Sequence, residues 1–280
     1  MTPSRPSEFV RQQVIGRVRA VFNDVENGQQ PVPPSDDALF AKDTPIRMVH
    51  ADAVSMMIGG IRSLLLQMLH PHPLQGVLDH SNFREDMHGR LRRTARFIAI
   101  TTFGHRDEAA KICDRVNHIH TQVNGTLPDG TPYSATDPRT LAWVHVAEAV
   151  SFLEAYIHYV KPAMPLADQD EYFRQFAQVA QMLGADPIPK TKREADALMR
   201  EFQPELRATK EAKEIARLVL TQRPKGAPIA VQKMLGTAAV DLLPRYARTM
   251  LELEDPGLAI IPAKAAAGVV GKTLRWAFKQ

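Results

Sequence analysis

The sequence predicts an all-α protein that folds as a single, mostly helical domain. Apolar residues recur with the 3.6-residue period of an amphipathic helix in one segment after another along the 280 residues. The period-2 alternation that is typical of half-buried strands is almost absent, and no internal repeat is present. Proline and turn signals separate the helical segments. The pattern therefore favours helices packed on helices around one core.

The elements are predicted in order along the chain. Residues 1–45 are expected to hold a helix over 8–27 and a proline-rich connector, ahead of one helical domain over 46–280. An apolar helix over 52–69 should stop at His70-Pro71-His72-Pro73, because proline cannot continue a helix. A turn-rich stretch over 124–138 ends in Asp137-Pro138, which is typical of a helix start. Further helices are expected over 89–103, 107–123, 138–160, 168–183, 192–201, 205–220, 229–243 and 247–253.

The composition excludes several classes of protein. Hydrophobic residues make up 44% and charged residues 24%, which is ordinary for a globular domain. The net charge is only +4, and the few aromatic residues are not interleaved with basic runs, so we expect no nucleic-acid partner. The single cysteine, Cys113, excludes an intrachain disulfide and a cysteine-rich metal site.

The sequence predicts no transmembrane segment. No apolar run follows the first residues, so we expect no secretory signal and a cytoplasmic protein. The longest apolar stretch, 53–69, is interrupted by Arg62 and Gln67 and is too short to span a bilayer. The C-terminal stretch 257–280 is apolar with spaced basic residues. A helix docked on the core is favoured there over a helix that lies on a membrane surface.

The histidines are distributed unevenly. All ten lie within residues 50–158, where a uniform spread would place about four. Neutral imidazole is the commonest metal-binding side chain in proteins. The middle third of the chain is therefore where we expect metal or cofactor chemistry.

The helix expected over 107–123 separates two of these histidines. At the helical angle of about 100° per residue, His120 falls at the edge of the apolar stripe, beside Ala109 and Cys113, whereas His118 faces water. On helix geometry alone, a core histidine with satisfied hydrogen bonds is favoured over a ligand at His120. The apolar stripe is predicted to be Ile112, Val116, Ile119 and Val123.

Two arginines are predicted to face inward on the helix over 89–103. Arg90 and Arg93 share a face with Phe97, whereas Arg92 and Arg96 point the opposite way. Arginine stays protonated and is rarely buried without an anion. The anions are either Asp and Glu side chains of this chain or carboxylates of a bound ligand, and both interpretations stay open.

The helix expected over 138–160 is apolar on nearly all sides, which predicts a central position. Its inward polar residues are His145 and Glu148, one helical turn apart. A carboxylate beside an imidazole fixes the tautomer and raises the basicity of the ring. A purely structural pair is equally consistent with this spacing.

Other catalytic templates do not match. Glu85 and His88 form a lone Glu-x-x-His, whereas a di-iron bundle needs two such motifs and two further glutamates. The chain contains no His-Glu-x-x-His, no glycine-rich phosphate loop and no Gly-x-Ser-x-Gly. Cys113 has no evident activating group and is expected to be structural.

A set of short motifs over 59–159 has a distinctive order and spacing. Leu-Leu-Leu-Gln-Met-Leu-His-Pro occupies 64–71, His80-Ser81 follows, and Arg-Leu-Arg-Arg-Thr occupies 90–94 ahead of Phe103-Gly104. Next come His-Thr-Gln-Val-Asn-Gly at 120–125, Tyr-Ser-Ala-Thr-Asp-Pro at 133–138, Trp-Val-His at 143–145 and Leu-Leu-Pro-Arg at 242–245. Together these motifs resemble the family of the latex clearing protein, a rubber oxygenase, and the fungal oxygenase MpaB.

The resemblance implies a helical fold around one haem b, with iron held by a single proximal histidine. His120 is the position we match to that ligand, and His145 is the alternative. The family's distal Arg-x-x-Lys-Thr appears here as Arg90-x-x-Arg93-Thr94. A guanidinium cannot deprotonate to bind iron. We therefore expect an open or water-bound sixth position, with Arg93 and Thr94 as distal donors and Arg90 paired with a haem propionate.

The predicted function is that of a haem b-dependent oxygenase. It would act with dioxygen or peroxide on an apolar or small aromatic substrate. The change from lysine to Arg93 and the missing secretory signal argue against rubber cleavage itself. The alternative is a non-catalytic protein: a haem-binding or haem-sensing protein, or a haem-free helical interaction module of the same fold.

Overall fold

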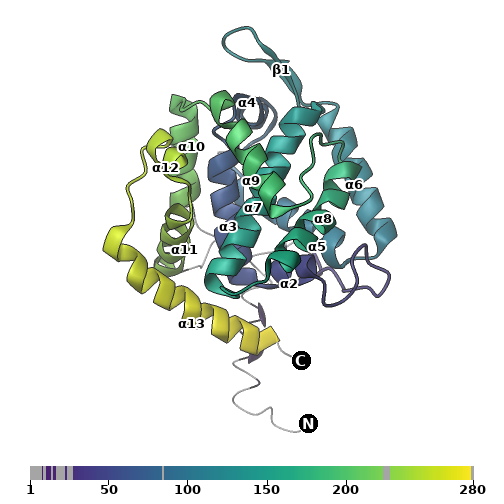
Figure 1. Cartoon of the computed structure of the whole chain (residues 1–280), viewed down its shortest axis with the longest axis vertical. Helices are drawn as coiled ribbons and strands as arrows, with labels where there is room; N and C mark the ends of the chain where they lie inside the picture. The colour runs from purple at the N-terminus through teal and green to yellow at the C-terminus, as the bar shows by residue number, and fades with distance from the viewer. Residues whose placement is uncertain are drawn as a thin grey trace.

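The computed structural model confirms the all-α prediction (Figure 1). It describes residues 28–83, 85–222 and 228–278, together with Glu8, 11–13, Ile15, Gly16 and Asn23. The helix predicted over 8–27 lies largely outside these residues, and the division of the chain at residue 45 stays a prediction.

Two long helices form the centre of the molecule. They are α3 (Ala53–Gln67) and α7 (Pro138–Tyr159), and they make the most extensive helix–helix contact in the described chain. Nearly every side of α7 is buried, as its apolar sequence predicted. A Cβ atom on Gly59 of α3 would lie 2.8 Å from the carbonyl oxygen of Ser151 and 2.9 Å from Cα of Phe152. Only glycine allows the two backbones to approach so closely.

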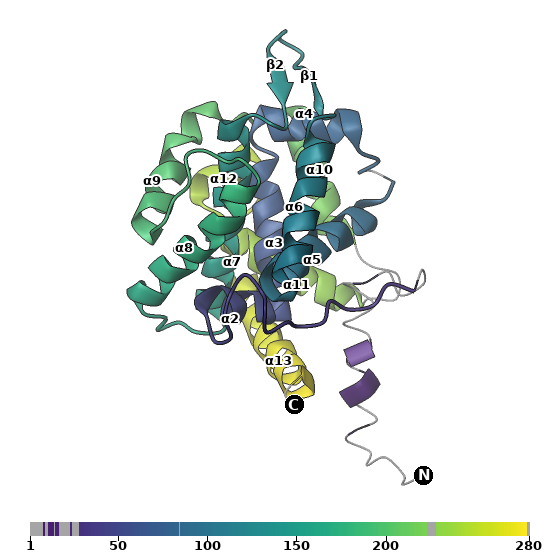
Figure 2. The ribbon, with the colours of Figure 1, turned by 90° about the vertical axis from the view of Figure 1, so that its right-hand side faces the viewer.

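The remaining helices surround this pair on two sides (Figures 1 and 2). On one side, α2, α5, α6 and α8 contact one another and α7; on the other, α10, α11 and α13 contact α3. The bounds are α2 (Pro45–Ala51), α4 (Pro71–His80), α5 (Met87–Phe103), α6 (Arg106–His120), α8 (Leu166–Met182), α9 (Lys192–Glu201), α10 (Lys210–Thr221), α11 (Ile229–Asp241), α12 (Arg245–Met250) and α13 (Ile260–Phe278), with 3-10 turns at Gln203–Glu205 and Gly257–Ala259.

Several elements differ from the sequence prediction. The helix α2 was not predicted, and the helix predicted over 205–220 begins only at Lys210. The helix α3 does end before His70, but Pro71 immediately begins the helix α4, and the His70 ring nitrogen accepts a hydrogen bond from the His72 amide. Proline is well suited to a first helical turn, because its missing N–H would have no partner there. The turn-rich stretch forms a small hairpin of β1 (Asn124–Thr126) and β2 (Pro132–Ser134). Its turn contains Gly130 at φ 88°, a left-handed conformation that glycine adopts without strain.

One helical segment of the described chain, Gly257–Phe278, is long and apolar enough to cross a membrane by length and composition. The pair Pro45–Ala51 and Ala53–Gln67 passes the same test only if the two helices count as one span, although they meet at 90°.

Replacing Gly59 with alanine should destabilise the protein. The new methyl group must push α3 away from α7, and overpacking of this kind costs about 1–3 kcal/mol in the free energy of unfolding. Urea unfolding followed by circular dichroism measures this. Gly268→Ala in α13 is the matched control, because nothing lies within 4 Å of the position that a Cβ atom would take there. Equal stability of the two variants would contradict the close approach of α3 and α7.

Candidate functional site

The hairpin of α5 and α6 brings several of the predicted site residues to one end of the fold. The two helices pack against each other and are joined by Gly104 and His105. Because this connection is short, the first half of α5 and the last turn of α6 both lie at the end of the hairpin away from it; Figure 2 shows the two helices next to each other. Arg90 and Thr94 lie on the former and His120 on the latter. The segment that follows α4 reaches the same end, where the Arg90 guanidinium donates to the Ser81 hydroxyl at 3.0 Å.

His120 is the last residue of α6 and is half-buried. Its Nδ1 is buried and has no hydrogen-bond partner among the described residues. Burial lowers the pKa of the ring, which favours neutral imidazole. The end of α6 is held in place one turn earlier, where the Asn117 amide donates to the carbonyl oxygen of Met182 at 2.8 Å. A buried polar atom without a partner is uncommon and calls for a ligand or bound water.

The face of α6 that carries His120 is the buried one. Ala109 and Cys113 are fully buried, and His118 is exposed, as predicted. The predicted apolar stripe is wrong at Ile119, which is 49% exposed. Burial raises the pKa of the Cys113 thiol to about 11, which fits its predicted structural role.

Arg90 faces inward, and Arg93 does not. The described partners of Arg90 are neutral: the Ser81 hydroxyl and the Phe83 ring, whose centroid lies 5.7 Å from the guanidinium carbon. Burial and the charge of Arg93 lower the pKa of Arg90. The predicted inward orientation is wrong for Arg93, whose side chain is 66% exposed and lies 3.4 Å from the Asp86 carboxylate. Thr94 is also exposed.

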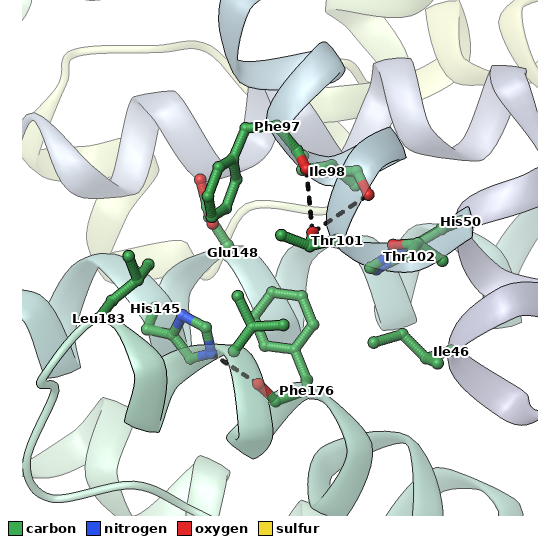
Figure 3. A pocket seen from close by; sticks show the side chains of 11 residues that line it. Ile46, His50, Phe97, Ile98, Thr101, Thr102, His145, Glu148, Phe176 and Leu183 are labelled. Carbon is green, nitrogen blue, oxygen red and sulfur yellow. Dashed lines mark hydrogen bonds between the residues drawn. The ribbon is translucent and has the colours of Figure 1, made fainter. Parts of the chain in front are cut away.

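A small cavity between α2, α5, α7 and α8 contains the other predicted histidine, His145 (Figure 3). The ring is buried against Phe176, with 4.3 Å between centroids, and Nε2 lies 3.1 Å from the Phe176 carbonyl oxygen. A carbonyl only accepts, so Nε2 carries the hydrogen and Nδ1 holds the lone pair. Burial lowers the pKa of His145 to about 4. The lining residues are Ile46, His50, Phe97, Ile98, Thr101, Thr102, His145, Glu148, Phe176, Val179 and Leu183.

Glu148 lines the same cavity, where burial raises the pKa of its carboxyl group to about 7 and a hydrogen bond from Gln67 opposes the rise. Glu148 and His145 have other hydrogen-bond partners than the predicted pairing with each other. His145 bonds to the Phe176 carbonyl oxygen, and Glu148 accepts a hydrogen bond from Gln67. The cavity itself measures about 20 Å³, room for about one water molecule. A carboxyl group with a pKa near neutrality beside such a space is suited to holding or releasing a proton.

His50 is a cavity residue that the sequence did not single out. Its Nδ1 lies 2.8 Å from the Thr102 hydroxyl, and the rings of Phe152, Tyr172 and Phe176 pack edge-on around it. Burial lowers its pKa to about 3. No pattern in the short helix α2 marks His50, because its surroundings come from α5, α7 and α8.

A second, open pocket of about 470 Å³ lies beside the β-hairpin. The Thr140 hydroxyl donates to Asp137 at 2.5 Å, so it accepts from Nδ1 of His72 at 3.1 Å, and Nε2 of that ring keeps the lone pair. His70 is 4% exposed and lies 3.4 Å from Glu205. None of the residues matched to the family's haem site lines this pocket. No group of three or more His, Cys, Asp or Glu side chains able to hold a metal ion is found among the described residues.

The fold and these sites define an all-α domain with several buried, neutral histidines. Residues 47–272 match the model of a family described as the ER-bound oxygenase mpaB/B′ and rubber oxygenase catalytic domain. The match covers most of the chain, so the chain belongs to this family of oxygenase catalytic domains, as the sequence motifs indicated. No curated protein and no solved structure matches the chain.

Replacing Glu148 with glutamine should stabilise the protein more at pH 8 than at pH 5. The fold raises the pKa of this carboxyl group from 4.5 to about 7. The native state therefore loses stability as the pH rises through that window, where it must give up a proton that the unfolded chain has already lost. Glutamine removes this cost, so the melting temperature should rise by a few degrees at pH 8. Glu108→Gln, on the exposed side of α6, is the control and should show no such gain. A pH-independent effect of Glu148→Gln would contradict the raised pKa.

Proposed function

We propose that this protein is a haem b-dependent oxygenase that acts with dioxygen or peroxide on an apolar or small aromatic organic substrate. Family membership supports the oxygenase class. The observation that carries the haem proposal is the buried Nδ1 of His120, which has no partner among the described residues and lies at the same end of the α5–α6 hairpin as Arg90 and Thr94. A cytoplasmic location stays a prediction.

The donor set at this end fits an iron ligand. His120 is neutral and has a ring nitrogen available, which are the requirements for coordination. His145 has one property of a metal-binding histidine, since its other ring nitrogen donates to a backbone carbonyl. His145 is buried beside a cavity with room for about one water molecule, however, whereas His120 is half-buried and its Nδ1 has no partner among the described residues, so we favour His120. When bound, haem supplies the activation of oxygen, and the protein controls it through the axial ligand and nearby donors.

The two arginines of the motif would have different roles. Arg90 is enclosed and has neutral partners in the described chain, so a propionate carboxylate would provide the anion that it lacks. Arg93 is held outward by an exposed contact with Asp86. Exposed ion pairs of this kind contribute about 1 kcal/mol or less. The side chain can therefore leave Asp86 at little cost and donate a hydrogen bond on the distal side, beside Thr94.

Replacing His120 with alanine should abolish stoichiometric haem binding. The wild-type protein, supplemented with haem, should show a Soret band, and His120→Ala should lose it or reduce it strongly. His118→Ala is the matched control on the exposed side of the same turn and should keep the band. If only His145→Ala loses the band, then His145 and not His120 is the iron ligand. A wild-type protein that shows no Soret band would refute the haem proposal.

Replacing Arg93 with lysine should change the spectrum of the haem-loaded protein. A guanidinium cannot coordinate iron, whereas a lysine amine can once it loses its proton. We expect Arg93→Lys to convert an open or water-bound sixth position to a six-coordinate low-spin form as the pH rises. The control is Arg96→Lys, because Arg96 lies one turn further along α5 and its guanidinium already donates to the Gln30 carbonyl oxygen at 2.9 Å. Identical spectra for Arg93→Lys and wild type across the pH range would place residue 93 away from the iron.

A further inference from the structure

The helix α13 has an unusual distribution of side-chain sizes. Its fully buried positions hold only small residues, namely Ala263, Ala267, Gly271 and Ala277. Eight large apolar side chains are exposed in the part of the chain that the structure describes, and five of them belong to this segment. They are Leu258, in the 3-10 turn that leads into α13, and Ile261, Val269, Trp276 and Phe278, with exposed fractions of 83%, 62%, 66%, 46% and 44%. At about 100° per residue, Leu258, Ile261, Val269 and Trp276 lie on one side, which we call the apolar face of α13, and Phe278 lies on the other.

Only part of this segment is arranged like a helix docked on a soluble core: Ile260, Val270 and Leu274 are partly buried against it, whereas the large residues named above are exposed. Such a helix turns its large apolar residues inward and its small or polar residues to water. Only 17% of the apolar window of 257–278 is buried in the fold. The apolar face extends from Leu258 to Trp276, a length of about 27 Å along the helix. A clustered apolar surface of this kind marks an interaction site, whereas single exposed apolar residues do not.

The charges of the segment point to an anionic partner. Residues 257–280 contain Lys264, Lys272, Arg275 and Lys279 and no Asp or Glu. Two of the basic residues are paired with the body of the protein: Lys264 lies 3.5 Å from Asp241, and Arg275 lies 2.6 Å from Asp52. Lys272 remains exposed within the apolar face, one turn from both Val269 and Trp276, where its long side chain can reach the surface of a membrane. Lipid headgroups would offer Lys272 an anion, whereas a symmetric contact between two copies of 257–280 would bring it no acidic residue.

The same ion pairs argue against a helix that crosses the bilayer. Arg275 joins α13 to Asp52, which is 7% exposed at the start of α3, and α13 packs along α11. In Figure 1 the helix lies across the lower side of the fold, with its long axis along the surface. A helix held in this way can enter only the outer, interfacial layer of a membrane, with apolar residues in the acyl boundary and basic residues at the headgroups.

We propose that α13 binds the protein peripherally to an anionic lipid surface, with Leu258, Ile261, Val269 and Trp276 inserted and the ammonium group of Lys272 at the headgroups. The proposal concerns a surface apart from the histidine sites and does not rest on haem. Its occupant is a phospholipid bilayer.

The two tryptophans make the test direct. Trp143 is fully buried in the centre of the fold and Trp276 is 46% exposed, so a lipid-induced blue shift of the emission reports on Trp276. The full-length protein is mixed with vesicles of phosphatidylcholine alone or with added phosphatidylglycerol, and binding is measured by co-sedimentation and by fluorescence. We expect binding and a blue shift with the anionic vesicles, weakened by salt.

Substitutions on α13 separate the apolar contribution to vesicle binding from the electrostatic contribution. Val269→Asp should weaken binding about tenfold or more, because it removes an inserted apolar group and adds a repelled charge. Lys272→Glu should weaken binding to anionic vesicles about fivefold or more. Leu166→Asp is the matched control, since Leu166 is 63% exposed on α8, and it should bind as the wild type does. Circular dichroism and melting curves confirm that each variant is folded.

Three results would overturn the proposal. One is a wild-type protein that binds neither type of vesicle. Another is Val269→Asp that binds as tightly as Leu166→Asp. The last is a wild-type dimer in light scattering that Val269→Asp dissociates, which would assign the apolar face to a second copy of the chain.

Discussion

The contact between α3 and α7 at Gly59 determines how the rest of the protein is arranged. At this point α3 lies against the backbone of Ser151 and Phe152, with no space for a side chain between them. The Arg62 guanidinium, one turn further along α3, donates to the Ser151 hydroxyl at 2.7 Å and to the Leu242 carbonyl oxygen at 2.9 Å. A buried arginine is tolerated here because both of these acceptors are fixed by the helix contact. The same crossing therefore joins α3, α7 and the end of α11.

The properties of the candidate sites follow from the effect of close packing on the protonation state of buried histidines. Burial lowers the pKa of His50, His120 and His145, and each ring is neutral at physiological pH. For His50 and His145 the hydrogen-bond partners are an adjacent hydroxyl and a backbone carbonyl, and their rings complete the aromatic packing. His120 has the same protonation state without a partner at Nδ1 among the described residues. The difference between a core histidine and a candidate ligand is therefore one hydrogen bond.

The sequence could predict features that depend on the residues of a single helix. It could not predict features that depend on how several helices pack together. The central position of α7 and the buried side of α6 follow from periodicity along one helix, so His120 and His118 were placed correctly. The helix α4 was missed, because Pro71 gives the same signal whether it ends one helix or begins the next. Arg93 was placed inward because a helical wheel carries no information about the cap residue Asp86, which holds it outside. His50 was missed because its surroundings belong to other elements.

The helix α13 shows the same limit of sequence-based prediction for a helix at the protein surface. A segment that is apolar on all sides has no face that periodicity can assign to the core, so the sequence favoured simple docking. The structure confirms the docking, with alanine and glycine buried and Ile260, Val270 and Leu274 partly buried against α3 and α11, and it also leaves four large apolar residues of the segment exposed on the other side. It also shows how such a helix is connected to the interior. Asp52, the partner of Arg275, caps α3 by accepting from the Ser55 amide at 2.9 Å and lies two residues after His50, which lines the cavity. The buried Asp52 carboxylate therefore holds both the start of α3 and α13. Because of this, the position of α13 on any surface depends on the junction of α2 and α3. Since α2 forms one wall of the cavity around His145 and Glu148, α13 is connected to that cavity as well.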